Sequence, residues 1–362
     1  MKTRISGDFF GENLIVTIKE YLKEKTAMLA AAGIEDADNE AWVCLLDGTG
    51  LSRSAFREDG KHIGAVLSKS QIDFLETLFA RRAGHEPLAY IVGKAPFYDL
   101  EFSVGKGVLI PRFDTEILVE TALGSLGYPV MLPELSSLPR CEMHCNTVTN
   151  ADISRLSDSF GSSAPKEDTK VRILDLCTGT GCVGITIAHE LMKKGVAFDL
   201  VMTEISEEAA SFARENASRI LGDLSWKVEV VDLWPAVSDS EGGNRVSDEK
   251  GESAPKKDPA FKADILVSNP PYVRIEEMKE LAPEVKDHEP ALALTDQGDG
   301  LSLYRRIIEG VDRYLAPGGV LAVEHGCEQG AEVRKILETG LKEVMTIQDY
   351  GHLDRVTCGK RK

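Results

Sequence analysis

The second half of the chain alternates short apolar segments with longer amphipathic ones, and this alternation restricts the possible fold more than any other feature. The apolar segments are VRILDL, DLVMTE, KVEVVD, ADILVSN and GVLAVEHG. A helical pattern follows the first segment to about Lys194 and the second to about Ile220, and another, over Leu301 to Leu315, precedes the last segment. Strands that alternate with helices form a mostly parallel sheet covered on both faces. The last segments, VMTIQDY and DRVTCGK, fit a closing hairpin. We therefore expect an α/β fold with a doubly wound, mostly parallel sheet.

The first part of the chain has a different period. Apolar residues recur there at helical spacing, as in Leu14, Ile15, Ile18, Tyr21 and Leu22, and again in Ile72, Leu75, Leu78 and Phe79. After Val92 the period shortens, and residues 97–100, 102–104 and 108–110 look like strands. We predict a helical domain over 1–92, a β-hairpin linker over 93–112 and an α/β domain over 113–362.

Two segments interrupt the alternation, at 127–170 and 236–262. Both are rich in Ser, Pro, Gly and charge, and they share a short similarity, SDSFGSSAPKED at 157–168 and SDEKGESAPKKD at 247–258. Such composition is typical of segments that cannot bury enough apolar surface to order themselves. We predict flexible surface insertions.

Charge and cysteine content exclude several classes of function. A formal charge of -17 disfavours a nucleic-acid partner, because no basic stripe is segregated to offset it. The seven cysteines are odd in number and scattered, which argues against a disulfide framework. The cluster CEMHC at 141–145 lacks a second ligand pair at zinc spacing, so we predict no metal site. No long apolar run is present, and we expect a cytoplasmic monomer that does not bind membranes.

A glycine-rich turn follows the first strand of the α/β region. The segment ILDLCTGTGCVG places Gly179, Gly181 and Gly184 between a strand and a helix. Glycines there let the backbone approach a ligand and present the helix N-terminus to it. Glu204 closes the next strand, where a carboxylate can accept hydrogen bonds from both ribose hydroxyls. The pattern predicts a site for an adenosine-containing cofactor.

The glycines alone do not name the reaction, because a dinucleotide-binding turn has the same pattern. Asp175 favours S-adenosyl-L-methionine, since nearby carboxylate and carbonyl groups stabilise its cationic methionine portion. Asp232 and Leu233, after the third strand, lie where we expect the adenine base. An acid at a strand end can equally cap a helix, so two roles remain open for Asp232.

The tetrapeptide Asn269-Pro270-Pro271-Tyr272 (NPPY) follows the fourth strand, at the sheet edge where open α/β folds bind ligands. The Asn269 side-chain oxygen and the Pro270 carbonyl can each accept one N–H of a planar NH2 group, which turns the nitrogen lone pair toward a methyl donor. Prolines have a fixed φ and hold that carbonyl in place. Tyr272 can stack on the acceptor. We predict that all four residues bind substrate and that Asn269, Pro270 and Tyr272 are catalytic.

Several motifs together resemble the peptide chain release factor glutamine N5-methyltransferase family. They are HEPLAYIVGKAPFYDLEF, VLIPRFDTEILVE, ILDLCTGTG, ILVSNPPYV, HEPALALTDQGDGLSLYRRII and LAPGGVLAVEHG, and they extend through nearly the whole chain. The resemblance implies methylation of the glutamine in the Gly-Gly-Gln motif of release factors, with the helical domain holding the protein substrate. It also implies cofactor contacts from Cys177, Thr178, Gly179, Thr180, Gly181, Glu204, Leu233 and Asn269.

The chain departs from this family pattern at a few positions. Cys177 stands where glycine is usual and Glu204 where aspartate is commoner. Phe113-Asp114 replaces Pro-Glu after LIPR, and the EHG at 324–326 replaces EIG. The departures leave NPPY intact, so they put substrate affinity in question more than the reaction.

Other functions share parts of the pattern. A sister family methylates a ribosomal-protein glutamine with the same pocket, although the Thr115-Glu116 pair favours the release-factor branch. NPPY would also suit an exocyclic amine of a nucleic acid, which the acidic charge disfavours. A dinucleotide-dependent oxidoreductase would explain the glycines but leave NPPY without a role. A non-catalytic scaffold that binds release factors or ribosomal partners would leave both the glycine-rich turn and NPPY without a role.

Overall fold

The computed structural model describes residues 16–56, 61–128, 170–235 and 261–362. The chain divides into two compact units, of which the first comprises Met1–Lys94 and Leu281–His288 and the second Ala95–Glu280 and Glu289–Lys362. The CEMHC cluster, both copies of the internal similarity, Leu14 and Ile15 lie outside the described residues, as does nearly all of the predicted insertions at 127–170 and 236–262. The predicted domain boundaries at 92 and 112 stay predictions.

Amphipathic helices form the first unit. They are α1 (Ile18–Ala31), α2 (Ala37–Thr49), α3 (Lys69–Ala83), α4 (Leu88–Val92) and α9 (Pro283–Lys286), with 3-10 turns at Arg53–Phe56 and Ile63–Ala65. α3 begins with a capping box in which Ser68 and Gln71 satisfy each other's backbone N–H groups. Tyr21 of α1 and Phe79 of α3 are buried and meet edge to face, with ring centroids 6.1 Å apart. These helical faces are the ones that the apolar spacing predicts.

The short helix α9 belongs to the first unit although it lies about two hundred residues downstream of it in sequence. Arg82 and His85, at the end of α3 and just after it, reach Glu284 of α9 at 3.3 and 3.1 Å. The pKa of Glu284 is lowered because the hydrogen bonds from these side chains outweigh the opposing effect of burial. Local periodicity did not predict this attachment.

A seven-stranded sheet forms the second unit, with strand order β5-β4-β3-β6-β7-β9-β8. The strands are β3 (Val171–Leu176), β4 (Phe198–Glu204), β5 (Trp226–Val230), β6 (Ala263–Ser268), β7 (Leu315–Glu324), β8 (Leu341–Gln348) and β9 (Asp354–Arg361). The pairs among β5, β4, β3, β6 and β7 are parallel, whereas β9 is antiparallel to both β7 and β8. The expected doubly wound sheet with a closing hairpin is confirmed.

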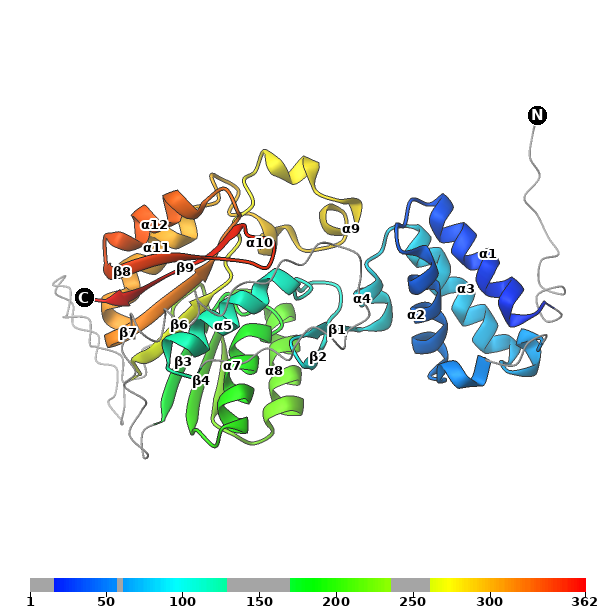
Figure 1. The fold of residues 1–362 in the computed structure, drawn as a ribbon, viewed down its shortest axis with the longest axis horizontal. Coiled ribbons are helices and arrows are strands. Elements are labelled where there is room, and N and C mark those ends of the chain that lie inside the picture. Colours follow the sequence, from blue (N-terminus) through cyan, green and yellow to red (C-terminus); the bar gives the residue numbers. More distant parts are fainter. Residues whose placement is uncertain (1–15, 57–60, 129–169, 236–260) are drawn as a thin grey trace, which may run out of the picture. The chain divides into compact units, whose positions relative to one another are not determined.

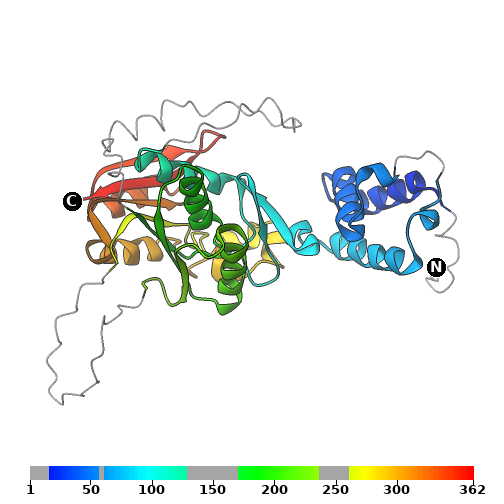
Figure 2. The same ribbon diagram turned by 90° about the horizontal axis from the view of Figure 1, so that it is seen from below.

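Helices cover both faces of this sheet, as Figures 1 and 2 show. α5 (Glu116–Ser125), α7 (Cys182–Lys193) and α8 (Glu207–Leu221) lie on one face, and α11 (Ser302–Tyr314) and α12 (Gly330–Glu338) on the other. Side chains of β3 alternate between two apolar cores, so that Ile173 packs with α5 and α7, and Leu174 packs with α11. The second unit also contains the short helix α10 (Ala291–Leu294) and 3-10 turns at Phe113–Thr115 and Glu277–Glu280.

A small hairpin of β1 (Lys94–Phe97) and β2 (Leu100–Ser103) precedes α5. The strand predicted over Val108 to Ile110 is wrong, because these residues form no strand. The Ile110 N–H instead donates to Glu289 Oε2 at 3.2 Å, and Pro111 follows it. A side-chain acceptor far away in sequence therefore replaces the strand partner. Among the described residues, no helix is both long and apolar enough to cross a bilayer.

Candidate functional site

A cavity of about 380 Å³ lies within the second unit at the carboxyl ends of β3, β4, β5 and β6. Its walls come from four places in the sequence: the segment 107–112 with Thr115, the glycine turn, the ends of β4 and β5, and residues between Pro290 and Arg306. The glycine turn lines the cavity with residues 177–180, Cys182 and Val183, and Gly181 is not among the lining residues. Asn269 and Pro271 complete the wall. The carboxyl edge of a parallel sheet is where α/β folds bind ligands.

The glycine turn has the backbone conformation that its sequence predicts. Gly179 and Gly181 have φ angles of +56° and +82°, which only glycine adopts without strain. A Cβ on Gly184 would lie 2.9 Å from Asp175 Oδ2, so this glycine permits the close approach of α7 to β3. Cys177 also has a positive φ, +57°, at the position where the family resemblance leads us to expect glycine. The departure noted in the sequence therefore falls on a left-handed residue.

Asp175 anchors both ends of the turn. Its Oδ2 accepts a 2.6 Å hydrogen bond from the Thr178 hydroxyl and a 3.0 Å bond from the Gly184 N–H. Burial raises the pKa of Asp175 to about 7, although both hydrogen bonds lower it. Thr180 Oγ1 is buried and has no hydrogen-bond partner among the described residues. A ligand hydroxyl or carboxylate could supply one.

Glu204 holds the turn from the neighbouring strand. Its carboxylate accepts 3.0 Å hydrogen bonds from the backbone N–H groups of Gly179, Ile205 and Ser206. Each carboxylate oxygen has two lone pairs, so these three bonds leave capacity for a further donor. The side chain lines the cavity, which is consistent with the predicted contact to ribose hydroxyls.

The turn after β5 forms the next wall. Leu233 is buried with a φ of +72°, and the Thr203 hydroxyl donates to its carbonyl oxygen at 2.7 Å. Asp232 is exposed, and its carboxylate pairs with Arg306 at 2.9 Å. Both Asp232 and Arg306 line the cavity. Sequence reasoning considered a cap or a cofactor contact for Asp232, and it missed the arginine.

NPPY divides between the cavity and the protein interior. Asn269 and Pro271 line the cavity, whereas Pro270 and Tyr272 are not among its lining residues. The Tyr272 hydroxyl donates to Glu324 Oε1 at 3.2 Å, and burial together with this carboxylate raises the tyrosine's pKa well above its usual value. The Tyr272 carbonyl accepts a 3.0 Å bond from Gln329 Nε2. The catalytic role of Pro270 and the stacking role of Tyr272 stay predictions.

Sequence reasoning missed a second group of lining residues. They lie in two motifs that were noticed only as family resemblances, VLIPRFDTEILVE and HEPALALTDQGDGLSLYRRII, and include Ile110, Pro111, Arg112, Thr115, Pro290, Leu292, Ala293 and Asp296. Glu289 joins the two motifs, because it accepts both the Ile110 N–H and a hydrogen bond from Arg112. The side chain of Glu289 is buried, so this ion pair fixes the wall. The occurrence of both motifs in the same sequence was the signal that could have pointed to these lining residues.

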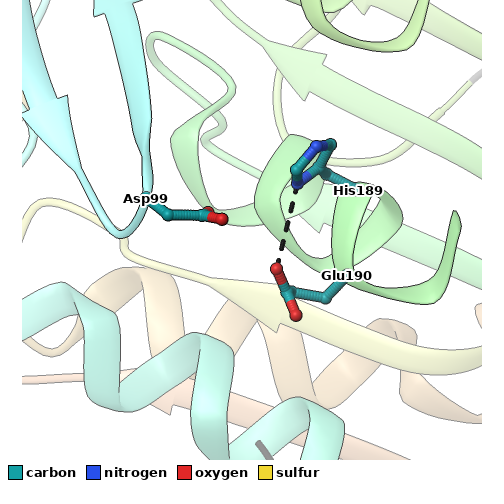
Figure 3. A group of neighbouring side chains, drawn as sticks. All are labelled: Asp99, His189 and Glu190. Carbon is teal, nitrogen blue, oxygen red and sulfur yellow. Dashed lines mark ion pairs between the residues drawn. The ribbon is translucent and has the colours of Figure 1, made fainter. Parts of the chain in front are cut away.

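One group of potential metal ligands lies away from the cavity lining. Figure 3 shows Asp99, in the β1–β2 turn, beside His189 and Glu190 of α7. Lys193 donates to Asp99 Oδ2 at 2.9 Å and to Glu190 Oε1 at 2.7 Å. Because its ammonium already pairs with both carboxylates, the group is accounted for as an ion-pair cluster.

Comparison with known proteins identifies the family. Residues 20–93 match the family model described as the PrmC N-terminal domain. Release factor glutamine methyltransferases of Geobacter sulfurreducens and Thermodesulfovibrio yellowstonii are each 31% identical to the chain. The first alignment covers 96% of the chain and 97% of the relative, and the second covers 80% and 82%.

A bifunctional methyltransferase of Rickettsia felis is 34% identical over 88% of the chain, which spans 53% of that protein. The chain thus spans about half of this longer relative and nearly all of the Geobacter protein. Together with the glycine turn and NPPY at one cavity, these similarities show that the chain belongs to the release factor glutamine methyltransferase family.

Proposed function

We propose that this chain transfers a methyl group from S-adenosyl-L-methionine to the side-chain amide nitrogen of the glutamine in the Gly-Gly-Gln motif of peptide chain release factors. One observation supports the proposal most strongly: Asn269 and residues 177–180 of the glycine turn line the same cavity. A cofactor held by the turn and an amide held by Asn269 would therefore meet without any rearrangement of the sheet. Proximity of this kind accounts for a large part of the acceleration of a bimolecular transfer.

The cavity lining fits the cofactor. Glu204 can accept ribose hydroxyls, Leu233 offers an apolar side for the adenine, and Asp175 places a carboxyl group near the cationic end. The remaining contacts that we assign to the cofactor are Cys177, Thr178, Gly179, Thr180, Gly181, Asp232 and Asn269. When bound, S-adenosylmethionine supplies an electrophilic methyl group.

The protein's own residues orient the acceptor. A planar amide has two N–H groups, and we assign them to the Asn269 side-chain oxygen and the Pro270 carbonyl. With both hydrogens held in one plane, the nitrogen lone pair points out of that plane, toward the methyl donor. Pro271, in the cavity wall, limits the movement of the loop. The nitrogen becomes acidic once it is methylated, so its proton can be lost without a strong general base. Positioning is therefore the main contribution of these residues.

Release factors are the protein substrate that the relatives' names support. The net charge of -17 makes a direct nucleic-acid substrate less favourable than a neutral or basic protein surface. We further propose that the enzyme acts as a monomer in the cytoplasm, where release factors function.

Purified full-length chain, labelled S-adenosylmethionine and purified release factor test the proposal directly. We expect one methyl group per release factor, located by mass spectrometry on the tripeptide glutamine, and none on a release factor in which that glutamine is replaced by alanine. Parallel reactions contain ribosomal protein, tRNA and duplex DNA. Label transferred to one of these in preference to the release factor would overturn the substrate assignment.

The acceptor assignment is tested separately from cofactor binding. Asn269→Ala is expected to lower kcat by at least about a hundredfold, the scale associated with losing one positioned polar contact at a reacting centre. Cofactor affinity measured by calorimetry should change much less, because the turn and Glu204 remain. Unchanged turnover in this variant would refute the role of Asn269.

A further inference from the structure

The buried side chain of Asn216, on α8, links two segments that are far apart in sequence. Its Nδ2 donates to the backbone carbonyls of Ser103, at the end of β2, and of Thr180, in the glycine turn, at 3.1 and 3.0 Å. Its Oδ1 accepts from the Ser103 N–H at 2.7 Å and from Arg219 Nη2 at 2.9 Å. Asn216 is fully buried, so water does not compete for these bonds. All four residues belong to the second unit.

These four bonds fix the orientation of the Asn216 amide. A primary amide has two N–H donors and one oxygen with two lone pairs, so all of its hydrogen-bonding capacity is used here. A backbone carbonyl can only accept, and a backbone N–H can only donate. Rotating the amide by half a turn would set its NH2 group against the Ser103 N–H and its oxygen against two carbonyl oxygens. Asn216 therefore has one orientation, in which its donors face the carbonyls of Ser103 and Thr180.

The Thr180 carbonyl is the part of the glycine turn that this side chain holds. The next residue, Gly181, has a φ of +82° and is the residue from which α7 begins. The Gly181 carbonyl accepts the first bond of the helix, from the Ile185 N–H at 2.9 Å. The Thr180 carbonyl precedes the helix and receives its donor from α8 instead. Since Thr180 lines the cavity, the direction of this peptide group helps to set the shape of the cavity wall.

Asn216 contributes to the turn what its two carboxylates cannot. Asp175 accepts the Thr178 hydroxyl, and Glu204 accepts the Gly179 N–H, so both hold donors of the turn. Asn216 holds an acceptor of the turn, and an ionised carboxylate has no hydrogen to donate in its place. Loss of the Asn216 donor would leave the Thr180 carbonyl buried without that partner, although the other two anchors remain.

We propose that Asn216 is a positioning residue for cofactor binding, which holds the Thr180 peptide group of the glycine turn in the shape that S-adenosyl-L-methionine requires. This inference rests on the proposed function, since it assumes that the turn holds the cofactor. Asn216 is not among the residues that line the cavity, and it acts through Thr180. Without this bond the turn must be returned to its shape whenever cofactor binds, and the free energy of that step lowers the affinity.

Asn216→Asp removes the donor end of the side chain and keeps its shape. The carboxylate can still accept from the Ser103 N–H and from Arg219, whose charge balances it, but it presents an oxygen to the Thr180 carbonyl. We expect Kd for S-adenosylhomocysteine, measured by calorimetry, to rise about tenfold or more. At saturating cofactor, kcat for release factor methylation should stay within about threefold, because Asn269 is untouched. A loss of kcat at saturation as large as the loss of affinity would overturn the proposal.

Glu215→Ala is the matched control for the contact between α8 and β2. Glu215 is the neighbouring residue on α8, and its Oε1 accepts from the Ser103 hydroxyl at 2.7 Å. This bond reaches β2 but not the glycine turn. Kd for S-adenosylhomocysteine should therefore stay within about twofold of the unmodified enzyme. A rise as large as that in Asn216→Asp would assign the effect to the contact with β2 and contradict a role through Thr180.

Leu221→Ala is the control for loss of stability. Leu221 is buried at the end of the same helix, in the apolar core that α8 shares with α7. Alanine there removes apolar contacts and should lower the thermal midpoint without changing Kd by more than about twofold, because Leu221 does not line the cavity. Equal losses of affinity in Leu221→Ala and Asn216→Asp would show that general destabilisation is sufficient and would refute the positioning role.

Asn216→Ala keeps the inference testable if Asn216→Asp does not fold. Alanine removes the four bonds without placing an anion in the interior, and Kd should rise at least about fivefold. If the unmodified enzyme neither binds S-adenosylhomocysteine nor methylates the release factor, the proposed function fails. If it does both, while the folded Asn216 variants keep the Kd of the unmodified enzyme, only the role of Asn216 is refuted.

Discussion

The backbone N–H of Gly179 donates a 3.0 Å hydrogen bond to Glu204 Oε2, which joins the glycine turn after β3 to the end of β4. The other carboxylate oxygen accepts from the N–H groups of Ile205 and Ser206, both at 3.0 Å. Glu204 therefore holds the shape of the turn before any cofactor contact is made. It is the one side chain that both shapes the cavity and is proposed to bind the ribose.

Glu204→Gln should weaken cofactor binding by about tenfold or more, because one oxygen becomes an NH2 group that opposes backbone or ribose donors. Calorimetric titration with S-adenosylhomocysteine measures the change. Glu207→Gln is the control, since Glu207 is an exposed residue in the first turn of α8 and pairs with Arg214. Equal affinity of the Glu204 variant and the control would show that the carboxylate does not contact the ligand.

Cys177 combines a left-handed backbone with a half-buried side chain that lines the cavity. Burial raises its pKa to about 12, so the thiol stays protonated and does not act as a nucleophile. Cys177→Gly should leave the free energy of unfolding within about 1 kcal/mol of that of the unmodified protein, because relief of left-handed strain offsets the greater freedom of the unfolded chain. Cys177→Val should destabilise the protein by more than about 1 kcal/mol, since β-branched residues rarely adopt this φ. Chemical denaturation of both variants checks the difference, and equal stabilities would contradict the assigned conformation.

How far the sequence predicts this molecule depends on the range of the interactions involved. The strands β3 to β7 were predictable, because each is a short, mainly apolar segment whose pattern is encoded locally. β8 and β9 were predictable as the closing hairpin. The wrong strand at Val108 to Ile110 had a suitable local pattern, but the Ile110 N–H pairs with Glu289, which is distant in sequence.

The same reason explains which site residues were found. Gly179, Glu204 and Asn269 lie at strand ends, where the topology alone predicts a ligand. Thr115 and Glu324 each belong to noticed motifs, yet their connection to Asn269 and Tyr272 spans 154 and 52 residues. No periodicity carries information over such separations.

Gly300 lies directly against NPPY, with a φ of +73°. A Cβ at this position would overlap the Tyr272 carbonyl oxygen and lie 2.7 Å from Gln329 Nε2, which hydrogen-bonds to that carbonyl. Gly300→Ala should therefore displace Tyr272, destabilise the protein by about 2 kcal/mol or more and lower kcat.

Gly195→Ala is the matched control for this variant. Gly195 has a φ of +72° and nothing within 4 Å of the added Cβ, so alanine there meets only the backbone strain, about 1 kcal/mol. The difference between the two melts isolates the contact with Tyr272. Equal destabilisation by the two alanines would mean that Gly300 does not support NPPY.

Turnover should depend on the ionisation of Glu324. Burial raises the pKa of this carboxyl to about 7, while hydrogen bonds from Thr115 and Tyr272 and the charge of Arg355 lower it and Asp114 raises it. Only the ionised form is restricted to accepting hydrogen bonds, and it accepts one from Tyr272 of NPPY. We therefore expect kcat to rise between about pH 6 and pH 8 with a midpoint near 7.

The pH profile needs a control because Asp175 in the glycine turn also has a pKa raised to about 7 by burial. Its titration would alter cofactor affinity. This affinity is measured separately over the same pH range, and the cofactor concentration is kept saturating in the kinetic assay. In Glu324→Gln the rise in kcat should disappear. A rise that persists in this variant would assign the titration to another group.

Glu120 is another carboxyl group whose pKa is raised by burial, and it lies outside the cavity lining. Its Oε1 accepts a 2.5 Å hydrogen bond from the Tyr350 hydroxyl, and its Oε2 has no partner among the described residues. Burial raises the pKa of Glu120 to about 7, although the Tyr350 bond lowers it. A folded-state pKa above the unfolded value means that the protonated carboxyl contributes stability fully below about pH 4.5, and that this contribution is lost as the pH rises through 7.

Glu120→Gln should accordingly stabilise the protein at pH 8.5 by on the order of 1 kcal/mol or more, because a neutral amide replaces a buried anion and can still accept from Tyr350. At pH 5 the native carboxyl is already protonated, so the same substitution should change stability by less than about 0.5 kcal/mol. Urea denaturation of the full chain at both pH values gives the two differences, and the titrations of Asp175 and Glu324 cancel between variant and parent. Glu309→Gln, at an exposed position in α11, should show no such pH dependence. If Glu120→Gln gave the same change at pH 5 and pH 8.5, the carboxyl would not titrate in this range.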